Sequence, residues 1–155
     1  MRLYLVQHGQ AKSEAEDPQR GLTSQGDDEV KRVADVVKKM GLNPSKIYHS
    51  GKLRAKQTAK IIREALYRPV EAAQGLAPTD DVQLWADKIN QSDNELMLVG
   101  HLPFMEKLTS YLITGDEDIR PVLFRFGAIN CLEQKEDKKW AIRWILTPEI
   151  AQSLS

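Results

Sequence analysis

The sequence has one cysteine, no long apolar run and no net charge, and each of these shortages excludes a class of protein. The 155 residues include 22 Lys and Arg against 22 Asp and Glu, so the formal net charge at pH 7 is zero. A balanced chain lacks the basic surface that nucleic acid or an anionic membrane would bind. The single Cys131 can form neither an internal disulfide nor a zinc site built from several thiolates. The N-terminal apolar run, residues 3–6, is too short for a secretion signal or a membrane span.

What remains is the composition of an ordinary globular protein. Hydrophobic residues make up 41% of the chain and charged residues 28%, which excludes disordered, fibrous and collagen-like proteins. No repeat, low-complexity stretch or Gly-, Ser- or Pro-rich linker divides the chain. We therefore expect residues 1–155 to form a single domain in a reducing compartment, with the cytoplasm as the expected location. We expect it to bind neither nucleic acid nor a membrane.

Apolar segments typical of strands alternate along the chain with segments of helical period. Residues 2–7 and 95–99 are continuous apolar runs, typical of buried strands. The first helical segment is expected to begin after Thr23 or Ser24 and to end at Gly41. The predicted strands are 2–7, 46–49, 70–72, 95–99, 122–132 and 139–146, with helices expected around 30–40, 53–66, 82–89 and 103–112. This alternation predicts an α/β sandwich with a largely parallel sheet and an antiparallel edge.

Two of the three histidines occupy matching places in this pattern. His8 and His101 each follow an apolar strand directly and lie next to a glycine. Because ligands of open α/β sheets bind at the carboxyl ends of the strands, adjacent strands would bring both imidazoles into one crevice. The alternative is that each histidine only satisfies hydrogen bonds of a turn. For the third histidine, His49, that turn-stabilising role is the expected one.

Arg54 lies in the first turn of the second predicted helix. Free backbone N–H groups at a helix N-terminus favour an anion, and a guanidinium adds a planar pair of donors for phosphate oxygens. Taken alone, Arg54 is more simply a solvated surface residue. Together with two imidazoles, however, it describes a phosphate site with a candidate nucleophile.

Three ordered segments carry a resemblance to a known family. Residues 3–9, LYLVQHG, resemble the opening strand and Arg-His-Gly signature of the histidine phosphatase superfamily, which has the phosphoglycerate-mutase-like fold. Residues 50–59, SGKLRAKQTA, are similar to its Ser-Pro-x-x-Arg-Ala-x-Gln-Thr-Ala run, and residues 99–103, VGHLP, to its Gly/Ser-His block. The short chain and the segment 20–26, RGLTSQG, are most similar to the SixA-type phosphohistidine phosphatases. The resemblance implies a three-layer α/β/α sandwich with a mostly parallel central sheet.

The resemblance also implies a mechanism and a substrate. His8 would attack phosphorus and form a covalent phosphohistidine, which water then hydrolyses. His101 and Arg54 would stabilise the transferring group, with no metal ion or cofactor. Gly9 and the hydroxyl of Ser13 would contribute to phosphate binding, although Ser13 is more simply an ordinary loop residue. The implied partner is a phosphohistidine-bearing protein, such as a histidine-phosphotransfer domain.

One position departs from the family pattern. The arginine that precedes the catalytic histidine in the family is Gln7 here. Glutamine keeps hydrogen-bond donors but lacks the fixed charge, a loss of about 10- to 100-fold in rate if nothing compensates. Arg20 is the candidate that would supply the missing charge at phosphate. It is equally compatible with a surface position on a loop.

The sequence offers no clear general acid, which bears on the substrate. Asp80 and Asp81 lie at about the right place in the chain, but a role at the start of a helix is the simpler interpretation. The imidazole of phosphohistidine leaves more readily than an alkoxide, so a missing acid favours phosphohistidine over sugar phosphates. Two alternatives remain within the superfamily: a degenerate member that binds phosphate or a phosphoprotein without turnover, and a small-molecule phosphatase. A metal-dependent hydrolase using His8, His101 and an aspartate lacks the usual ligand spacing.

Overall fold

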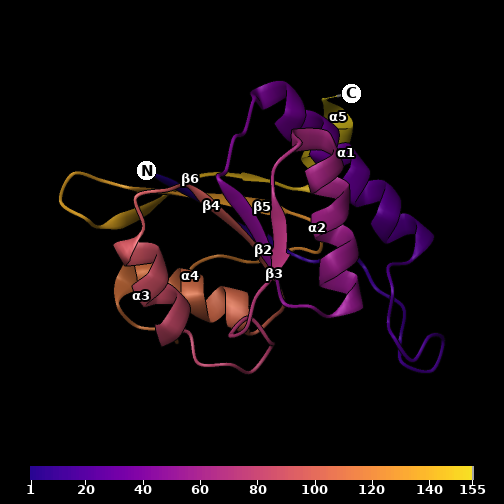
Figure 1. Cartoon of the computed structure of the whole chain (residues 1–155), viewed down its shortest axis with the longest axis horizontal. Helices are drawn as coiled ribbons and strands as arrows, with labels where there is room; N and C mark the ends of the chain where they lie inside the picture. The colour runs from indigo at the N-terminus through magenta and orange to yellow at the C-terminus, as the bar shows by residue number, and fades with distance from the viewer. Residues whose placement is uncertain (155) are drawn as a thin grey trace.

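A computed structural model, which describes residues 1–154, shows one six-stranded sheet with helices on both of its faces (Figure 1). The strands are β1 (Arg2–Gln7), β2 (Lys46–His49), β3 (Val70–Ala72), β4 (Leu96–Gly100), β5 (Ile129–Gln134) and β6 (Trp140–Leu146). The helices are α1 (Ser24–Met40), α2 (Leu53–Leu66), α3 (Gln83–Gln91), α4 (Phe104–Thr114) and α5 (Pro148–Ser153). No helix among residues 1–154 is long and apolar enough to span a membrane.

The sheet is mostly parallel and ends in two antiparallel strands. Its strand order is β3-β2-β4-β1-β5-β6. The pairs β2–β3, β2–β4 and β1–β4 are parallel, whereas β5 runs antiparallel to both β1 and β6. The predicted three-layer α/β/α sandwich with an antiparallel edge is therefore confirmed. Because β1 and β4 are direct neighbours, their carboxyl ends lie together at the centre of one sheet edge.

Each face of the sheet is covered by its own set of helices. In Figure 1, α1, α2 and α5 lie on one side of the sheet, and α3 and α4 lie on the other. The apolar run of β1 serves both layers because successive side chains of a strand point to opposite faces. Tyr4 and Val6 belong to the core under α1 and α2, whereas Leu3 and Leu5 belong to the core under α3 and α4.

Helix α1 begins and ends at the predicted capping residues. The hydroxyl of Thr23 accepts a hydrogen bond from the backbone N–H of Gly26 at 2.9 Å, which satisfies one of the free donors of the first turn. Gly41 ends the helix with a φ of 75°, a left-handed conformation that costs glycine little. Gly26 has a further role, since a Cβ there would collide with the backbone of Gln10. The helix therefore packs directly against the loop that follows β1.

Two parts of the prediction for the C-terminal region were wrong. The predicted strand 122–132 begins only at Ile129, because the preceding segment crosses the end of β1 as a loop. Gly127, with a φ of 75°, donates its N–H to the carbonyls of Gln7 and His8, and this bond replaces strand pairing. Helix α5 was not predicted. Its sequence signal is Thr147-Pro148, an N-cap hydroxyl followed by a proline in the first turn.

Candidate active site

The parallel pairing of β1 and β4 brings His8 and His101 together. Gln7 pairs with Gly100 in the register of the two strands, and the N–H of His8 donates to the carbonyl of Gly100 at 3.0 Å. The two imidazole centroids lie 5.0 Å apart, with an angle of 53° between the rings. Both side chains are almost fully buried, with His8 5% exposed and His101 1% exposed. The histidines that the sequence singled out thus form one site at the sheet edge.

The tautomer of His8 follows from its hydrogen bond to the backbone. Its Nδ1 lies 2.7 Å from the carbonyl oxygen of Gly9, which only accepts, so Nδ1 carries the proton and Nε2 keeps its lone pair. The N–H of Gly9 donates to the hydroxyl of Thr58 at 3.0 Å, and that hydroxyl donates to the carbonyl of Arg54 at 2.8 Å. Through Thr58, helix α2 therefore fixes Gly9, the residue that orients the nucleophile candidate. A Cβ at Gly9 would lie only 2.7 Å from Val30, so no larger residue fits.

Burial keeps both imidazoles neutral at pH 7. The pKa of His8 is lowered to about 4, mainly by desolvation, with a smaller contribution from the positive charges of Arg54 and Arg20. Desolvation, together with the neighbouring His8 and Arg54, lowers the pKa of His101 to about 3. A neutral His8 with a free Nε2 is the state in which an imidazole acts as a nucleophile.

Acidification is expected to destabilise the protein through these two histidines. An unfolded histidine binds its proton near pH 6.5, whereas folded His8 binds it only near pH 4. The unfolded state binds more protons between these values, so the free energy of unfolding falls as the pH drops through this window. For His8 the full effect is about 3 kcal/mol. Chemical denaturation at about pH 7, 5.5 and 4.5 should show a smaller pH dependence for His8→Asn and His101→Asn than for the wild type. Equal slopes in all three proteins would contradict the assignment.

Three buried polar atoms without a hydrogen-bond partner gather on site residues. They are Nδ1 of His101, Nε of Arg54 and Oε1 of Gln7; among the described residues, only Oδ1 of Asn130 shares this property elsewhere. The other ring nitrogen of His101 lies 2.6 Å from the hydroxyl of Ser50 at the end of β2. Because unpaired buried polar atoms are rare in folded proteins, their concentration here indicates a site built for a polar ligand.

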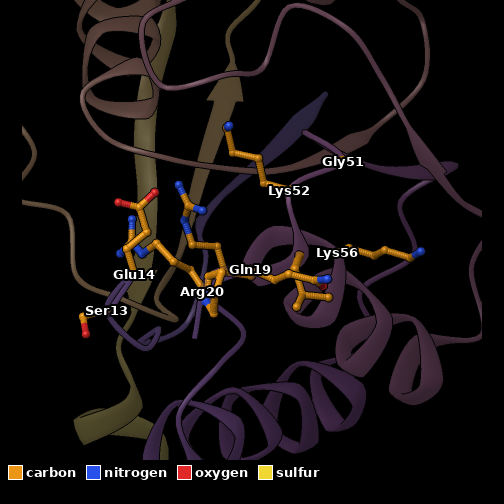
Figure 2. A pocket seen from close by; sticks show the side chains of 10 residues that line it. Ser13, Glu14, Gln19, Arg20, Gly51, Lys52 and Lys56 are labelled. Carbon is orange, nitrogen blue, oxygen red and sulfur yellow. The ribbon is translucent and has the colours of Figure 1, made fainter. Parts of the chain in front are cut away.

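A basic pocket of about 800 Å³ opens around Arg54. Four basic residues line it: Arg20, Lys52, Arg54 and Lys56. One acidic residue, Glu14, also belongs to the lining. Figure 2 shows that the side chain of Lys56 extends away from those of Arg20 and Lys52. Burial and the charge of Arg20 both lower the pKa of Arg54. Two guanidinium groups that repel each other are stabilised when an anion binds between them.

Arg20 reaches this pocket because its loop is held at several points. Its φ of 54° lies in the left-handed region, which is uncommon for a residue with a side chain. Its Nε donates to the carbonyl of Lys12 at 3.1 Å, and the next N–H, of Gly21, donates to the carboxylate of Asp17 at 2.9 Å. The N–H of Leu22 donates to the side chain of Gln57 on α2 at 2.7 Å. Helix α2 thus anchors the loop that presents Arg20.

Two of the predicted phosphate-binding residues, Gln7 and Ser13, differ in their position relative to the basic pocket. Gln7 lines a second cavity of about 570 Å³, whose lining also includes Leu102 and Phe126, the residue whose ring contacts His8. Ser13 lies at the rim of the basic pocket, but its hydroxyl donates to Glu16 at 3.0 Å. Contact of either side chain with phosphate remains a prediction.

Three further candidates have local structural partners. Asp80 accepts from the N–H of Ala77, and Asp81 accepts from the N–H of Gln83 at the start of α3, both at 2.9 Å. His49 accepts from the N–H of Gly51 at 3.0 Å, as expected for a turn. Sequence reasoning missed Phe126, whose ring centroid lies 5.5 Å from that of His8, because it is distant in sequence and carries no motif.

Comparison with known proteins agrees with this geometry. Residues 3–80 match the model of the histidine phosphatase superfamily (branch 1). The chain therefore belongs to the histidine phosphatase superfamily.

Among individual proteins, the chain is similar to the phosphohistidine phosphatase SixA of Escherichia coli strain K12, with 28% identity over 155 residues, 96% of this chain and 94% of that protein. The solved structure of the protein histidine phosphatase SixA complexed with tungstate superposes with a TM-score of 0.85 and 26% identity over the full length of both chains. An uncharacterized protein of Picosynechococcus sp. strain PCC 7002 is 38% identical over 111 residues, 66% of this chain and 67% of that protein. These similarities support a phosphatase of the SixA type.

Proposed function

We propose that this protein hydrolyses phosphohistidine on a partner protein, through a covalent phosphohistidine on His8. The observation that carries the proposal is the pair of imidazoles at the ends of β1 and β4, 5.0 Å apart, with the proton of His8 held on Nδ1 by the carbonyl of Gly9. A neutral imidazole with a free Nε2 beside Arg54 has the properties of a phosphoryl acceptor.

The reaction proceeds in two transfers. In the first, Nε2 of His8 attacks phosphorus, the bond between phosphorus and the substrate nitrogen breaks, and the leaving imidazole takes a proton from solvent. In the second, water attacks phosphorus, orthophosphate leaves, and His8 returns to its neutral form. Throughout, the charge on the phosphoryl oxygens is stabilised by the guanidinium groups of Arg54 and Arg20.

His101 serves as a neutral hydrogen-bond donor in this scheme. The hydroxyl of Ser50 accepts from the N–H of Lys52 at 3.3 Å, which leaves its own proton free to donate to Nε2 of His101, 2.6 Å away. This arrangement supports a proton on Nδ1 of His101, the buried atom without a partner. Nδ1 is therefore the atom assigned to donate to a phosphoryl oxygen.

The substrate assignment rests on the leaving group and on the similarity to SixA. Asp80 and Asp81 are engaged in local hydrogen bonds, which is unfavourable for a general acid that would assist an alkoxide. Phosphohistidine needs less assistance because imidazole leaves more easily. We further propose that the whole chain, residues 1–155, acts as one domain in the cytoplasm, without a metal ion or cofactor.

The test is release of orthophosphate from a histidine-phosphotransfer domain phosphorylated on histidine. We expect release by the wild type, and a gain of about 10-fold or more in Gln7→Arg if the missing charge limits the rate. Gln7→Glu, with the opposite charge and nearly the same shape, is the matched control and should be slower than the wild type.

The presence of Gln7 in place of arginine also favours a second candidate function. The protein would then be a member of the superfamily that binds a phosphoprotein without hydrolysing it. In that case the wild type would bind the phosphorylated domain and release nothing, whereas Gln7→Arg would release phosphate. Absence of both binding and release in either protein would contradict both functions.

A further inference from the structure

A loop from the C-terminal half of the chain covers His8 with an aromatic ring. Phe126 is 41% exposed, and its ring lies against that of His8 with 5.5 Å between centroids and an angle of 43°. The next residue, Gly127, donates its N–H to the carbonyls of Gln7 at 3.0 Å and His8 at 3.2 Å. The backbone of this loop is thus fastened to the end of β1.

The preceding residue, Arg125, fastens the loop to two helices. Its guanidinium donates to both carboxylate oxygens of the buried Glu29 on α1, at 2.7 and 3.2 Å. Its Nε donates to Glu149 on α5 at 2.8 Å, and its Nη1 also donates to the carbonyl of Phe126 at 2.7 Å. One side chain therefore holds α1, α5 and the backbone of Phe126 together, with nearly all its donors used.

Phe126 contributes an apolar ring next to His8, whereas the other groups considered around His8 are titratable or charged. The others are His101 from the end of β4, Arg54 from α2 and Arg20 from the loop before α1. The two arginines disfavour a positive charge on His8, and His101 is itself neutral at pH 7. Burial is nevertheless the largest cause of the low pKa of His8, and the ring of Phe126 lies against one side of the imidazole.

We infer that Arg125 is a positioning residue that holds Phe126 against His8, and that this cover keeps water away from one side of the nucleophile. The inference rests on the proposed function only in treating His8 as the nucleophile. Removing the ring or its anchor lets water reach His8, which stabilises the protonated imidazole. The acidic limit of activity then moves to higher pH, while the rate at pH 7, where His8 is neutral in either case, changes much less.

The experiment measures the pKa of His8 by NMR, from the pH dependence of its imidazole resonances. The resonances of the three histidines are assigned by their loss in His49→Gln and in His101→Gln. Phe126→Ala is expected to raise the pKa of His8 by about one pH unit. Arg125→Ala should shift it in the same direction, whereas Phe126→Leu, which keeps an apolar cover, should restore most of the wild-type value. Leu123→Ser is the matched control, because Leu123 lies on the same loop, is 92% exposed and makes no ring contact with His8.

The pH profile of phosphate release provides the second readout. Its acidic limb should shift with the pKa of His8 in Phe126→Ala and Arg125→Ala. A folded Arg125→Ala protein with an unchanged His8 titration would overturn the positioning role, as would an equal shift in Leu123→Ser.

If Arg125→Ala does not fold, Arg125→Lys is the variant to use. Lysine keeps a positive charge beside Glu29, but it cannot bind Glu29, Glu149 and the carbonyl of Phe126 at the same time. A raised pKa of His8 in this variant supports the inference, and an unchanged one contradicts it. Because the titration needs no turnover, these outcomes are distinguishable from failure of the proposed function. An inactive wild type refutes the phosphatase but leaves the shift in the His8 titration measurable.

Discussion

Replacing His8 with alanine is expected to reduce phosphate release by about 10⁴-fold or more, because the covalent route has no other acceptor in the site. Nε2 of His8 is the nitrogen left free by the bond between Nδ1 and Gly9, and the imidazole of His101 is engaged by Ser50. Acid quenching of wild-type reactions should trap an acid-labile phosphate on the protein. His8→Ala should trap none.

His49→Ala is the control for this experiment. His49 is also buried, but its ring accepts from the N–H of Gly51 and is engaged in a turn. Its loss should leave the phosphoenzyme intact and change the rate little. Full activity in His8→Ala, or labelled phosphate that persists in it, would refute His8 as the nucleophile.

Replacing Arg54 with methionine is expected to slow phosphate release by about 10²- to 10³-fold, the usual cost of one preorganised donor to a developing anion. The guanidinium is half-buried and its Nε has no protein partner, so methionine removes both the charge and the donors available to a phosphoryl group. Arg54→Lys should recover part of the rate, since it restores charge but not the planar pair of donors. Steady-state kinetics with the phosphorylated domain measures these effects.

Lys56→Met is the matched control for the charge at Arg54. Lys56 lies on the same helix and lines the same pocket, but its side chain extends away from Arg20 and Lys52 (Figure 2). We expect a change of less than about threefold, as for an exposed charge that makes no direct contact. If Lys56→Met were as damaging as Arg54→Met, the pocket would act through its overall positive potential rather than through a specific bond from Arg54.

The sequence predicted the order of elements because their local signals are strong. The continuous apolar run of β1, the N-cap at Thr23 and the left-handed stop at Gly41 act within a few residues of themselves. Because these signals do not depend on the rest of the chain, they can be read from the sequence alone. Strands β1, β2 and β3 accordingly have the predicted bounds. The same locality explains why Phe126 was missed, since nothing near it in sequence indicates that it lies against His8.

The sequence by itself determined most of the strands and helices and the residue types available for phosphoryl chemistry. Only the tertiary structure decided which of them meet. The parallel register of β1 and β4 sets His8 beside His101. Hydrogen bonds from the loop around Gly21 to Asp17 and Gln57 hold Arg20 at the pocket of Arg54. The physical reason is that hydrophobic period and capping are encoded within one element. Contacts across the sheet edge depend on strand order and loop anchoring, which are set by packing of the whole chain.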